Sequence, residues 1–308
     1  MWHALLTLFH FLPHLPMKVL FLHAHFDDYE FTAAGAFALW RQKLGSSLRT
    51  RLVVCTDGAA GHHFRTREET ARLRFNEQQA SARIGGFEFD VLRLPDGRVP
   101  REALQIDTPL LAALWKAIRD FEPDYIFCPP LSGDTLAGIH NDHETIAGAV
   151  RRVAYLINVP HAFTPEYAAD ETQSKPCKVP VILSVYDGYM SGANSFDFAV
   201  DVESVFSQIA EMTWCHQSQI REWLPWVGRH RMAPPASLEE WKVTLRKRFD
   251  RSNRELGLAG PHAHEVFKVT AWGEIPTLAQ LERDLPPLKQ TPEQRATLEA
   301  RLHRWNHE

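Results

Sequence analysis

The chain has 308 residues, of which 44% are hydrophobic and 23% charged, as in an ordinary globular protein rather than a disordered or fibrous one. This length is sufficient for one large domain with a substantial core. The 34 basic and 38 acidic residues give a net charge of −4, whereas a nucleic-acid-binding surface is normally clearly basic. We therefore expect no nucleic-acid partner.

The N-terminal segment and the cysteines bear on the cellular location. Residues 4–15 are apolar, but no Lys or Arg precedes them, no AxA-like cleavage site follows, and the stretch is too short to span a bilayer. We interpret residues 1–16 as an N-terminal extension and expect no membrane association. The cysteines are far apart and form no CxxC pair, which is typical of reduced thiols in a cytoplasmic protein: Cys55, Cys128, Cys177 and Cys215.

From residue 17 onward, short apolar runs alternate with longer helical patterns, which indicates a mostly parallel sheet covered by helices on both faces. Strands are expected at 18–23, 51–55, 89–94, 124–128 and 181–186. Helices are expected at 31–44, 66–84, 108–121, 144–156, 202–216 and 238–254. The predicted fold is an α/β three-layer sandwich with a Rossmann-like sheet, in which residues 17–275 form the main domain and 276–308 a helical C-terminal appendage. No GxGxxG follows the first strand, so no dinucleotide cofactor is expected.

Two of the predicted strand ends are rich in side chains that bind metals. AHFDDYE, residues 24–30, follows the first strand, and HNDH, residues 140–143, follows the fourth strand and begins a helix. In a doubly wound sheet, ligands bind at the carboxyl ends of the strands. Each motif alone has an ordinary explanation: a pair of aspartates often caps a helix, and an HxxH pair is often surface or core polarity. Their occurrence at two strand ends of one sheet favours a shared metal site.

The residue types in these motifs suit a catalytic zinc, which takes three protein ligands from histidine and carboxylate side chains and keeps one position open. We expect His25 and Asp28 to supply two ligands from one turn and His143 to supply the third. Adjacent carboxylates repel each other without a cation, so Asp27 is interpreted as a base beside the metal rather than as a ligand. The same ligands also suit Fe(II), Co(II) or Ni(II).

Three other polar positions accompany this predicted site. His140 lies one helical turn before the ligand of the second motif, so both rings can face one cleft. Asp142 can orient a histidine ring by accepting its second N–H, and the sequence does not identify which ring. His62 and His63 follow the second strand and either line the pocket or lie on the surface.

AHFDD (24–28) and HNDH (140–143) resemble the AHPDD and HPDH motifs of the PIG-L or LmbE-like family of N-acetylglucosaminyl deacetylases. Further similarity lies in TDGAAG (56–61), RFNE (74–77), LPDG (94–97) and HQSQ (216–219), so the resemblance extends over about residues 17–219. Phe26 replaces the proline of the first motif, and the segment between Asp134 and His140 is longer than the compact form of the family.

The resemblance implies zinc-dependent removal of the acetyl group from an N-acetylated amino sugar or glycoconjugate. It assigns roles to particular residues: zinc binding by His25, Asp28 and His143, general-base action by Asp27, stabilisation of the tetrahedral intermediate by His140, and contacts with sugar hydroxyls by Arg74 and Asp96. One alternative is a related metal-dependent amidase or deacylase acting on a thiol conjugate, an antibiotic or another N-acyl substrate. A non-catalytic sugar-binding protein is a further alternative, although such a protein has little need for Asp27 in addition to the ligands.

Overall fold

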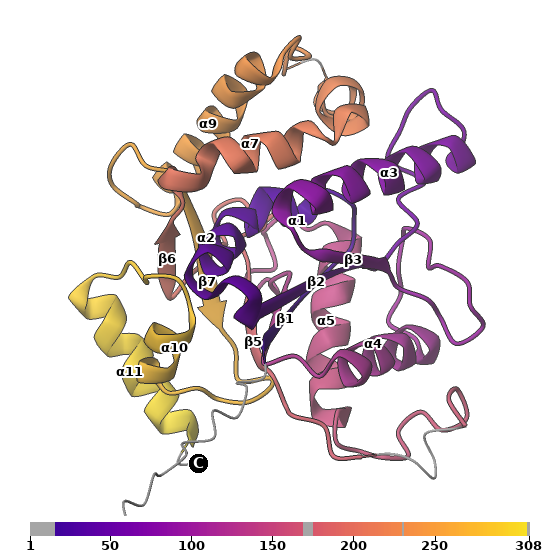
Figure 1. Cartoon of the computed structure of the whole chain (residues 1–308), viewed down its shortest axis with the longest axis vertical. Coiled ribbons are helices and arrows are strands. Elements are labelled where there is room, and N and C mark those ends of the chain that lie inside the picture. The colour runs from indigo at the N-terminus through magenta and orange to yellow at the C-terminus, as the bar shows by residue number, and fades with distance from the viewer. Residues whose placement is uncertain (1–15, 169–174, 230, 307–308) are drawn as a thin grey trace, which may run out of the picture.

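The computed structural model describes residues 16–168, 175–229 and 231–306, and it contains a seven-stranded sheet between layers of helices (Figure 1). The N-terminal extension predicted at 1–16 lies outside these ranges except for its last residue. The strand order is β3-β2-β1-β4-β5-β7-β6. Strands β1 to β5 pair in parallel and β7 pairs antiparallel with both β5 and β6. The predicted α/β sandwich with a mostly parallel sheet is therefore confirmed.

The strands are short and apolar at the centre of the sheet, as expected where helices cover both faces. Their bounds are β1 Met17–His23, β2 Leu48–Val54, β3 Glu88–Val91, β4 Tyr125–Cys128, β5 Val181–Ser184, β6 Phe198–Asp201 and β7 His264–Val269. Successive residues of β1 enter different cores: Val19 and Phe21 pack on one face, whereas Leu20 and Leu22 pack on the other. Two hydrophobic layers thus hold the central strands in place.

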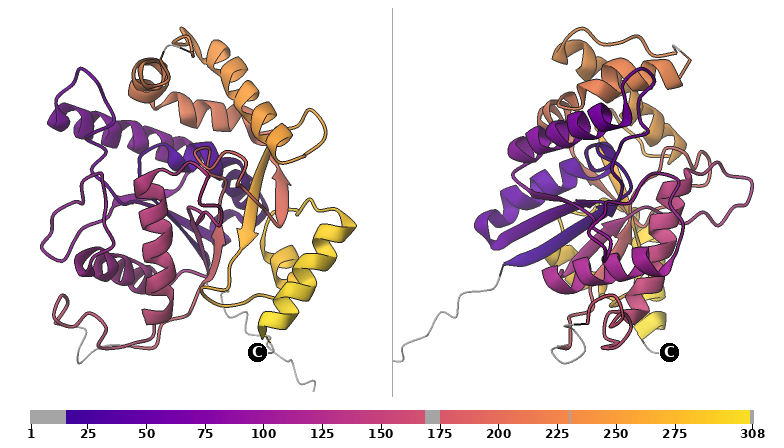
Figure 2. Two further views of the ribbon diagram at one scale, coloured as in Figure 1. Left: turned by 180° about the vertical axis from the view of Figure 1, so that it is seen from behind. Right: turned by 90° about the vertical axis from the view of Figure 1, so that its right-hand side faces the viewer.

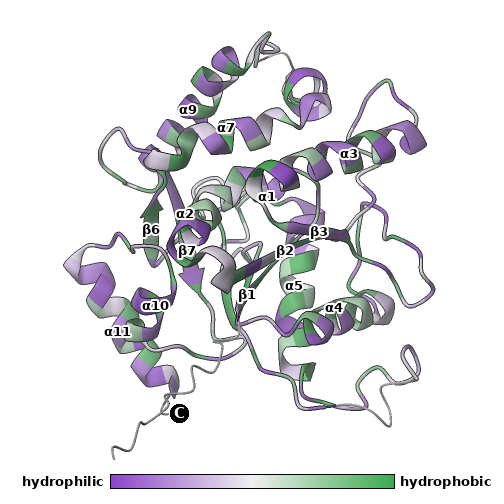
Figure 3. Ribbon diagram, viewed as in Figure 1, coloured by the Kyte–Doolittle hydropathy of each residue, from purple (hydrophilic) through white to green (hydrophobic). Residues whose placement is uncertain are grey.

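The helices are α1 Asp28–Thr32, α2 Ala34–Leu44, α3 Arg67–Gly85, α4 Thr108–Phe121, α5 Asn141–Leu156, α7 Phe206–Trp214, α8 Leu224–Val227, α9 Leu238–Glu255, α10 Leu278–Asp284 and α11 Pro292–Asn306. Short helical turns lie at Gly45–Ser47 and Glu203–Val205, and a π-helical turn at Ser218–Trp223. Helices α4 and α5 cover one face of the sheet, and α2, α3, α7 and α9 lie toward the other (Figure 2). Figure 3 shows α5 as a mostly hydrophobic helix and α3 as a mostly hydrophilic one.

Local sequence signals explain where several helices begin and end. Thr66 and Glu69 form the predicted capping box at the start of α3, and Gly86, with φ 63°, ends it. Asp107 caps α4 by accepting a hydrogen bond from the backbone N–H of Leu110. The helix predicted at 31–44 is instead two helices, because Ala33, with φ −147°, interrupts the helical backbone between α1 and α2.

The C-terminal residues from 276 onward are two helices that pack against the same core as α2. Leu278 and Leu281 of α10, with Leu298 and Leu302 of α11, are almost fully buried in that core. Between the helices, Lys289 exchanges backbone hydrogen bonds with Ala199 of β6. The boundary between the main domain and a C-terminal appendage stays a prediction. Within the described ranges, no helix is both long enough and apolar enough to cross a membrane.

Candidate active site

A pocket of about 430 Å³ opens where the carboxyl ends of β1, β4 and β5 meet, which is the usual ligand position in an open parallel sheet. Its volume is within the range of small-molecule binding sites. The turn after β1 contributes the first predicted motif, and the N-terminus of α5, which follows β4, contributes the second. The topology therefore brings both motifs, separated by more than a hundred residues, to one cavity.

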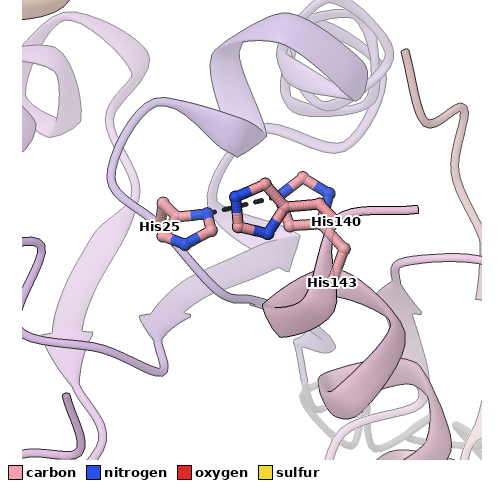
Figure 4. A group of neighbouring side chains, drawn as sticks. All are labelled: His25, His140 and His143. Carbon is pink, nitrogen blue, oxygen red and sulfur yellow. Dashed lines mark hydrogen bonds between the residues drawn. The ribbon is translucent and has the colours of Figure 1, made fainter. Parts of the chain in front are cut away.

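The three predicted metal ligands present their donor atoms to one another. His25 Nδ1 lies 3.2 Å from His143 Nε2, and Figure 4 shows these rings approaching from the turn and from the helix. Asp28 places Oδ1 3.3 Å from His143 Nε2 and Oδ2 3.4 Å from His25 Nδ1. Ligands at about 2.0–2.1 Å from a tetrahedral zinc ion are separated from each other by roughly 3.3 Å. The spacings of His143 Nε2 from His25 Nδ1 and from Asp28 Oδ1 thus match those of ligands on a tetrahedral ion, whereas the contact of Asp28 with His25 uses the other oxygen.

Buried carboxylates determine which nitrogen of each ring carries the hydrogen. His143 Nδ1 lies 3.0 Å from Oδ2 of Asp187, and His25 Nε2 lies 3.2 Å from Oδ2 of Asp142. An ionised carboxylate only accepts hydrogen bonds, so each of these nitrogens is the donor. In the neutral rings, His143 Nε2 and His25 Nδ1 therefore point lone pairs at each other and at the Asp28 carboxylate. The centre requires a positive charge.

Either a metal ion or a proton can supply this charge. Burial would lower the pKa of His143, but the carboxylates of Asp28 and Asp187 outweigh it and raise the pKa to about 10. Burial would likewise raise the pKa of Asp28, yet the surrounding histidines hold it well below its usual range. A protonated His143 thus balances the charge without a metal, and a divalent ion would displace that proton.

Asp28 is itself fixed by two contacts that leave Oδ1 facing the centre. Its Oδ2 accepts a hydrogen bond from the backbone N–H of His25 at 2.7 Å and lies 2.5 Å from His23 Nδ1. His23 and His140 widen the set of potential donors: His23, Asp28 and His143 form one group, and His25, His140 and His143 another, each with ligand atoms within 4.8 Å. The sequence analysis did not identify His23, which is the last residue of β1.

Asp27 lies beside this cluster in a separate environment. It has a left-handed backbone, with φ 87° and ψ −21°. Arg74 Nη2 donates to Asp27 Oδ1 at 2.9 Å and also to the carbonyl of Phe26. Burial raises the pKa of Asp27 to about 6, although the Arg74 guanidinium opposes the shift. The carboxylate lines the pocket at the edge of the metal-ligand cluster.

The structure identifies Asp142 as the partner of His25 and not of His140. Asp142 Oδ1 accepts from the backbone N–H of Leu104 at 2.7 Å, which leaves Oδ2 for the His25 ring. His140 caps α5 and accepts a hydrogen bond at Nδ1 from the backbone N–H of Asp142, at 3.3 Å. Burial and the charges of neighbouring histidines lower the pKa of His140 to about 4. A neutral His140 therefore carries its proton on Nε2.

Of the two residues assigned by resemblance to the sugar, only Arg74 lines the pocket. It is buried and held by Asp27, rather than paired with the nearby Glu77. Asp96 does not lie among the pocket-lining residues, and its side chain is 49% exposed. It accepts hydrogen bonds from the backbone and side chain of Arg98, so the local turn holds it at the surface. The structure therefore does not bring Asp96 to the site.

The paired histidines after β2 are also outside the pocket lining. His62 Nε2 lies 2.7 Å from Glu222, which also accepts hydrogen bonds from Arg65. His63 stacks on Trp226, with ring centroids 4.7 Å apart. These contacts tie the loop after β2 to the segment around α8, so the histidines have a packing role.

Sequence reasoning missed Asp187 although a usable signal existed. Asp187 directly follows the strand predicted at 181–186, so the strand-end rule that identified the other motifs applies to it as well. No comparable signal marks Tyr189, whose ring lies 4.9 Å from that of His140, or the pocket-lining side chains of Trp223 and Arg248. Their positions depend on how later segments pack over the sheet edge.

The fold and this cluster define an α/β protein with a histidine–carboxylate centre at the carboxyl edge of a parallel sheet. The sequence profile of the PIG-L family, described as GlcNAc-PI de-N-acetylase, matches residues 20–154. This part of the chain contains both motifs, and its match to the family profile confirms the resemblance inferred from them. The family match supports a hydrolytic N-deacetylase. A comparison with curated proteins gives no match.

Solved structures share the fold over most of the chain. An N,N'-diacetylchitobiose deacetylase from Pyrococcus horikoshii is 18% identical, with a TM-score of 0.61 over 82% of this chain and 83% of the other. The 4-carboxy-2-hydroxymuconate hydratase GalB from Pseudomonas putida is 16% identical, with a TM-score of 0.58 over 82% and 96%. A conserved protein from Thermus thermophilus is 21% identical, with a TM-score of 0.55 over 82% and 94%. Similarity at this level establishes the fold alone, since it includes both a deacetylase and a hydratase.

Proposed function

We propose that the protein is a zinc-dependent hydrolase that removes the acetyl group from an N-acetylated amino sugar or glycoconjugate. The convergence of His25 Nδ1, His143 Nε2 and the Asp28 carboxylate carries this proposal, because the two nitrogens are 3.2 Å apart and each lies within 3.4 Å of one carboxylate oxygen. The match of residues 20–154 to a family described as GlcNAc-PI de-N-acetylase supports the choice of an acetylated sugar.

The chain's own residues are suited to amide hydrolysis around that centre. When bound, zinc supplies Lewis-acid polarisation of the amide carbonyl and activation of water. Asp27 acts as the general base, and Arg74 holds its Oδ1 so that the carboxylate keeps one orientation. His140 is neutral and carries its proton on Nε2, so it can donate a hydrogen bond to the developing oxyanion.

Acetate release from defined substrates, measured with and without bound metal, tests the proposal. Zinc-loaded protein is expected to release acetate from N-acetylglucosamine or its conjugates, and chelator-treated protein is expected to lose this activity and regain it with added zinc. A parallel set of longer N-acyl amides and thiol conjugates separates deacetylation from the activity of a related amidase. If zinc-loaded protein releases acetate from none of the acetylated sugars, the proposed function is wrong.

A further inference from the structure

Helix α9 contributes two arginines to the wall of the active-site pocket. Arg248 and Arg251 are three residues apart, so they lie on the same side of the helix. Both line the pocket that contains the metal-ligand cluster, and both also line a smaller adjoining cavity with Thr32 and Tyr186. They lie well beyond residue 154, where the match to the family ends.

Neither guanidinium has an anionic partner within the described part of the chain: no carboxylate there lies within ion-pair distance of Arg248 or Arg251. Arg248 lies over the ring of Phe31, with 4.3 Å between the guanidinium carbon and the ring centroid. By contrast, Arg246 on the same helix forms a two-point ion pair with Glu203, with both distances at 2.7 Å. The two pocket-lining arginines of α9 thus have no carboxylate partner among the described residues, whereas Arg246 has one.

The nearby carboxylates are already engaged with other groups. Glu255, one turn beyond Arg251 on α9, accepts hydrogen bonds from the hydroxyl of Tyr186 at 2.9 Å and from the backbone N–H of Gly192 at 3.1 Å. Asp27 is paired with Arg74. The guanidinium of the half-buried Arg248 and that of the exposed Arg251 therefore remain available as donors at the pocket wall.

The two like charges repel each other across the pocket wall. Burial and the like charge of Arg251 lower the pKa of Arg248, although the charge of Asp27 opposes this. A planar guanidinium offers several N–H donors in a geometry that matches the oxygens of a phosphate or carboxylate. An anion held between the two arginines would relieve the repulsion and accept hydrogen bonds from both.

We propose that Arg248 and Arg251 form a subsite for an anionic group of the substrate, a phosphate or a carboxylate, beside the position that is deacetylated. This inference rests on the proposed function and narrows its substrate to an acidic N-acetylated sugar or glycoconjugate. The proposed metal ligands and the arginine pair line the same cavity. One small molecule can therefore contact both.

Substrate selectivity provides the main test. Acetate release is compared for neutral N-acetylglucosamine, for its 1-phosphate and 6-phosphate, and for N-acetylmuramic acid, which carries a carboxylate. The wild-type protein is expected to prefer at least one anionic substrate, and Arg248→Gln and Arg251→Gln are each expected to reduce that preference in kcat/KM by about 10- to 100-fold. The phosphate and carboxylate substrates show which anion the subsite accepts.

Arg254→Gln is the matched control, because Arg254 is exposed near the end of the same helix and does not line either cavity. This variant loses the same charge and is expected to keep the wild-type selectivity. An active enzyme whose selectivity is the same in the wild type, Arg248→Gln and Arg251→Gln overturns the subsite. A loss of selectivity in Arg254→Gln as large as in the other two would also overturn it, since net charge alone would then be responsible.

Calorimetric binding of inorganic phosphate and of glucosamine 6-phosphate separates this inference from the proposed function. Wild-type protein is expected to bind both more tightly than Arg248→Gln does, even if no acetate release is found with any substrate. In that case the deacetylase proposal fails and the anion subsite stands. Equal binding of both probes and unchanged substrate selectivity in the two proteins would overturn the subsite, whatever the outcome for acetate release.

Discussion

Replacing Asp187 with asparagine tests whether this carboxylate prepares His143 to bind a metal. Asp187 Oδ1 accepts a hydrogen bond from the backbone N–H of Tyr189 at 2.9 Å, and Oδ2 lies 3.0 Å from His143 Nδ1. An asparagine that keeps the first bond presents its NH₂ group to the ring. His143 must then accept at Nδ1, so its proton moves to Nε2 and removes the lone pair that faces Asp28.

The expected loss of zinc affinity follows from this reversal of the ring proton. Loss of a carboxylate that supports a metal-binding histidine typically costs about 10- to 100-fold in affinity, or roughly 1.4–2.7 kcal/mol. The side chain of Asp187 is only 3% exposed, so water cannot easily take its place. The loop itself should persist, because Asn194 bonds the backbone N–H and carbonyl of Asp187 independently of that side chain.

Competition between the protein and a chelator for zinc measures this affinity, and the ¹⁵N resonances of the histidine rings report the position of the proton. Asp201→Asn is the control, because Asp201 pairs with His262 at 2.6 Å on an exposed surface away from the pocket. Asp201→Asn is expected to bind zinc as the wild type does. Wild-type zinc affinity in a folded Asp187→Asn variant would refute the reasoning, because His143 would then not depend on this carboxylate.

Three other perturbations address the ligands, the base and a buried acid. His25→Ala, Asp28→Ala and His143→Ala should each abolish stoichiometric metal binding, since each removes one of three donors, and unchanged metal content in all three would exclude the assigned site. Asp27→Asn should keep the metal, because asparagine tolerates the left-handed backbone at this position. Its turnover should fall by about 10²–10⁴-fold, because asparagine cannot act as a base. Near-normal turnover would show that another residue is the general base. Glu265 accepts hydrogen bonds from the N–H groups at the start of α2, but burial raises its pKa to about 7. The folded protein therefore binds more protons than the unfolded chain between about pH 4.5 and 7, and the unfolding free energy should fall across this range by up to about 3 kcal/mol. Urea unfolding should show a shallower pH dependence for Glu265→Gln, and an unchanged slope would contradict the assignment.

The elements predicted best are those with complete local signals. Helix α4 has the predicted bounds of 108–121, because an amphipathic pattern lies between an aspartate cap and a left-handed Glu122. The sequence analysis did not predict β6 and β7, which are short and pair antiparallel with each other across more than sixty residues. Glu265 lies within β7 and interrupts its apolar pattern, and only the tertiary contact with the start of α2 explains its burial.

In the candidate site, too, some residues could be predicted from local sequence signals and others depend on tertiary contacts. The rule that ligands bind at the carboxyl ends of parallel strands was sufficient to predict that His25, Asp28 and His143 lie together. This rule depends only on strand order and direction. It could not identify the ring that Asp142 supports, because that depends on side-chain torsions at His25. Asp96 was assigned by resemblance alone, and a local bond to Arg98 holds it at the surface.

The pocket combines two parts of the chain that carry different information about function. The part that matches the family, residues 20–154, supplies the proposed metal ligands and His140, so the type of chemistry is proposed from its motifs. Residues after 154 supply Asp187, which orients a ligand, and Arg248, which faces the same cavity from α9. On the proposed assignments, changes in α9 are expected to alter which substrate is bound without disturbing the proposed metal ligands. For this reason the substrate has to be sought through the charge of the pocket wall, and an acidic sugar derivative is the first substrate to test.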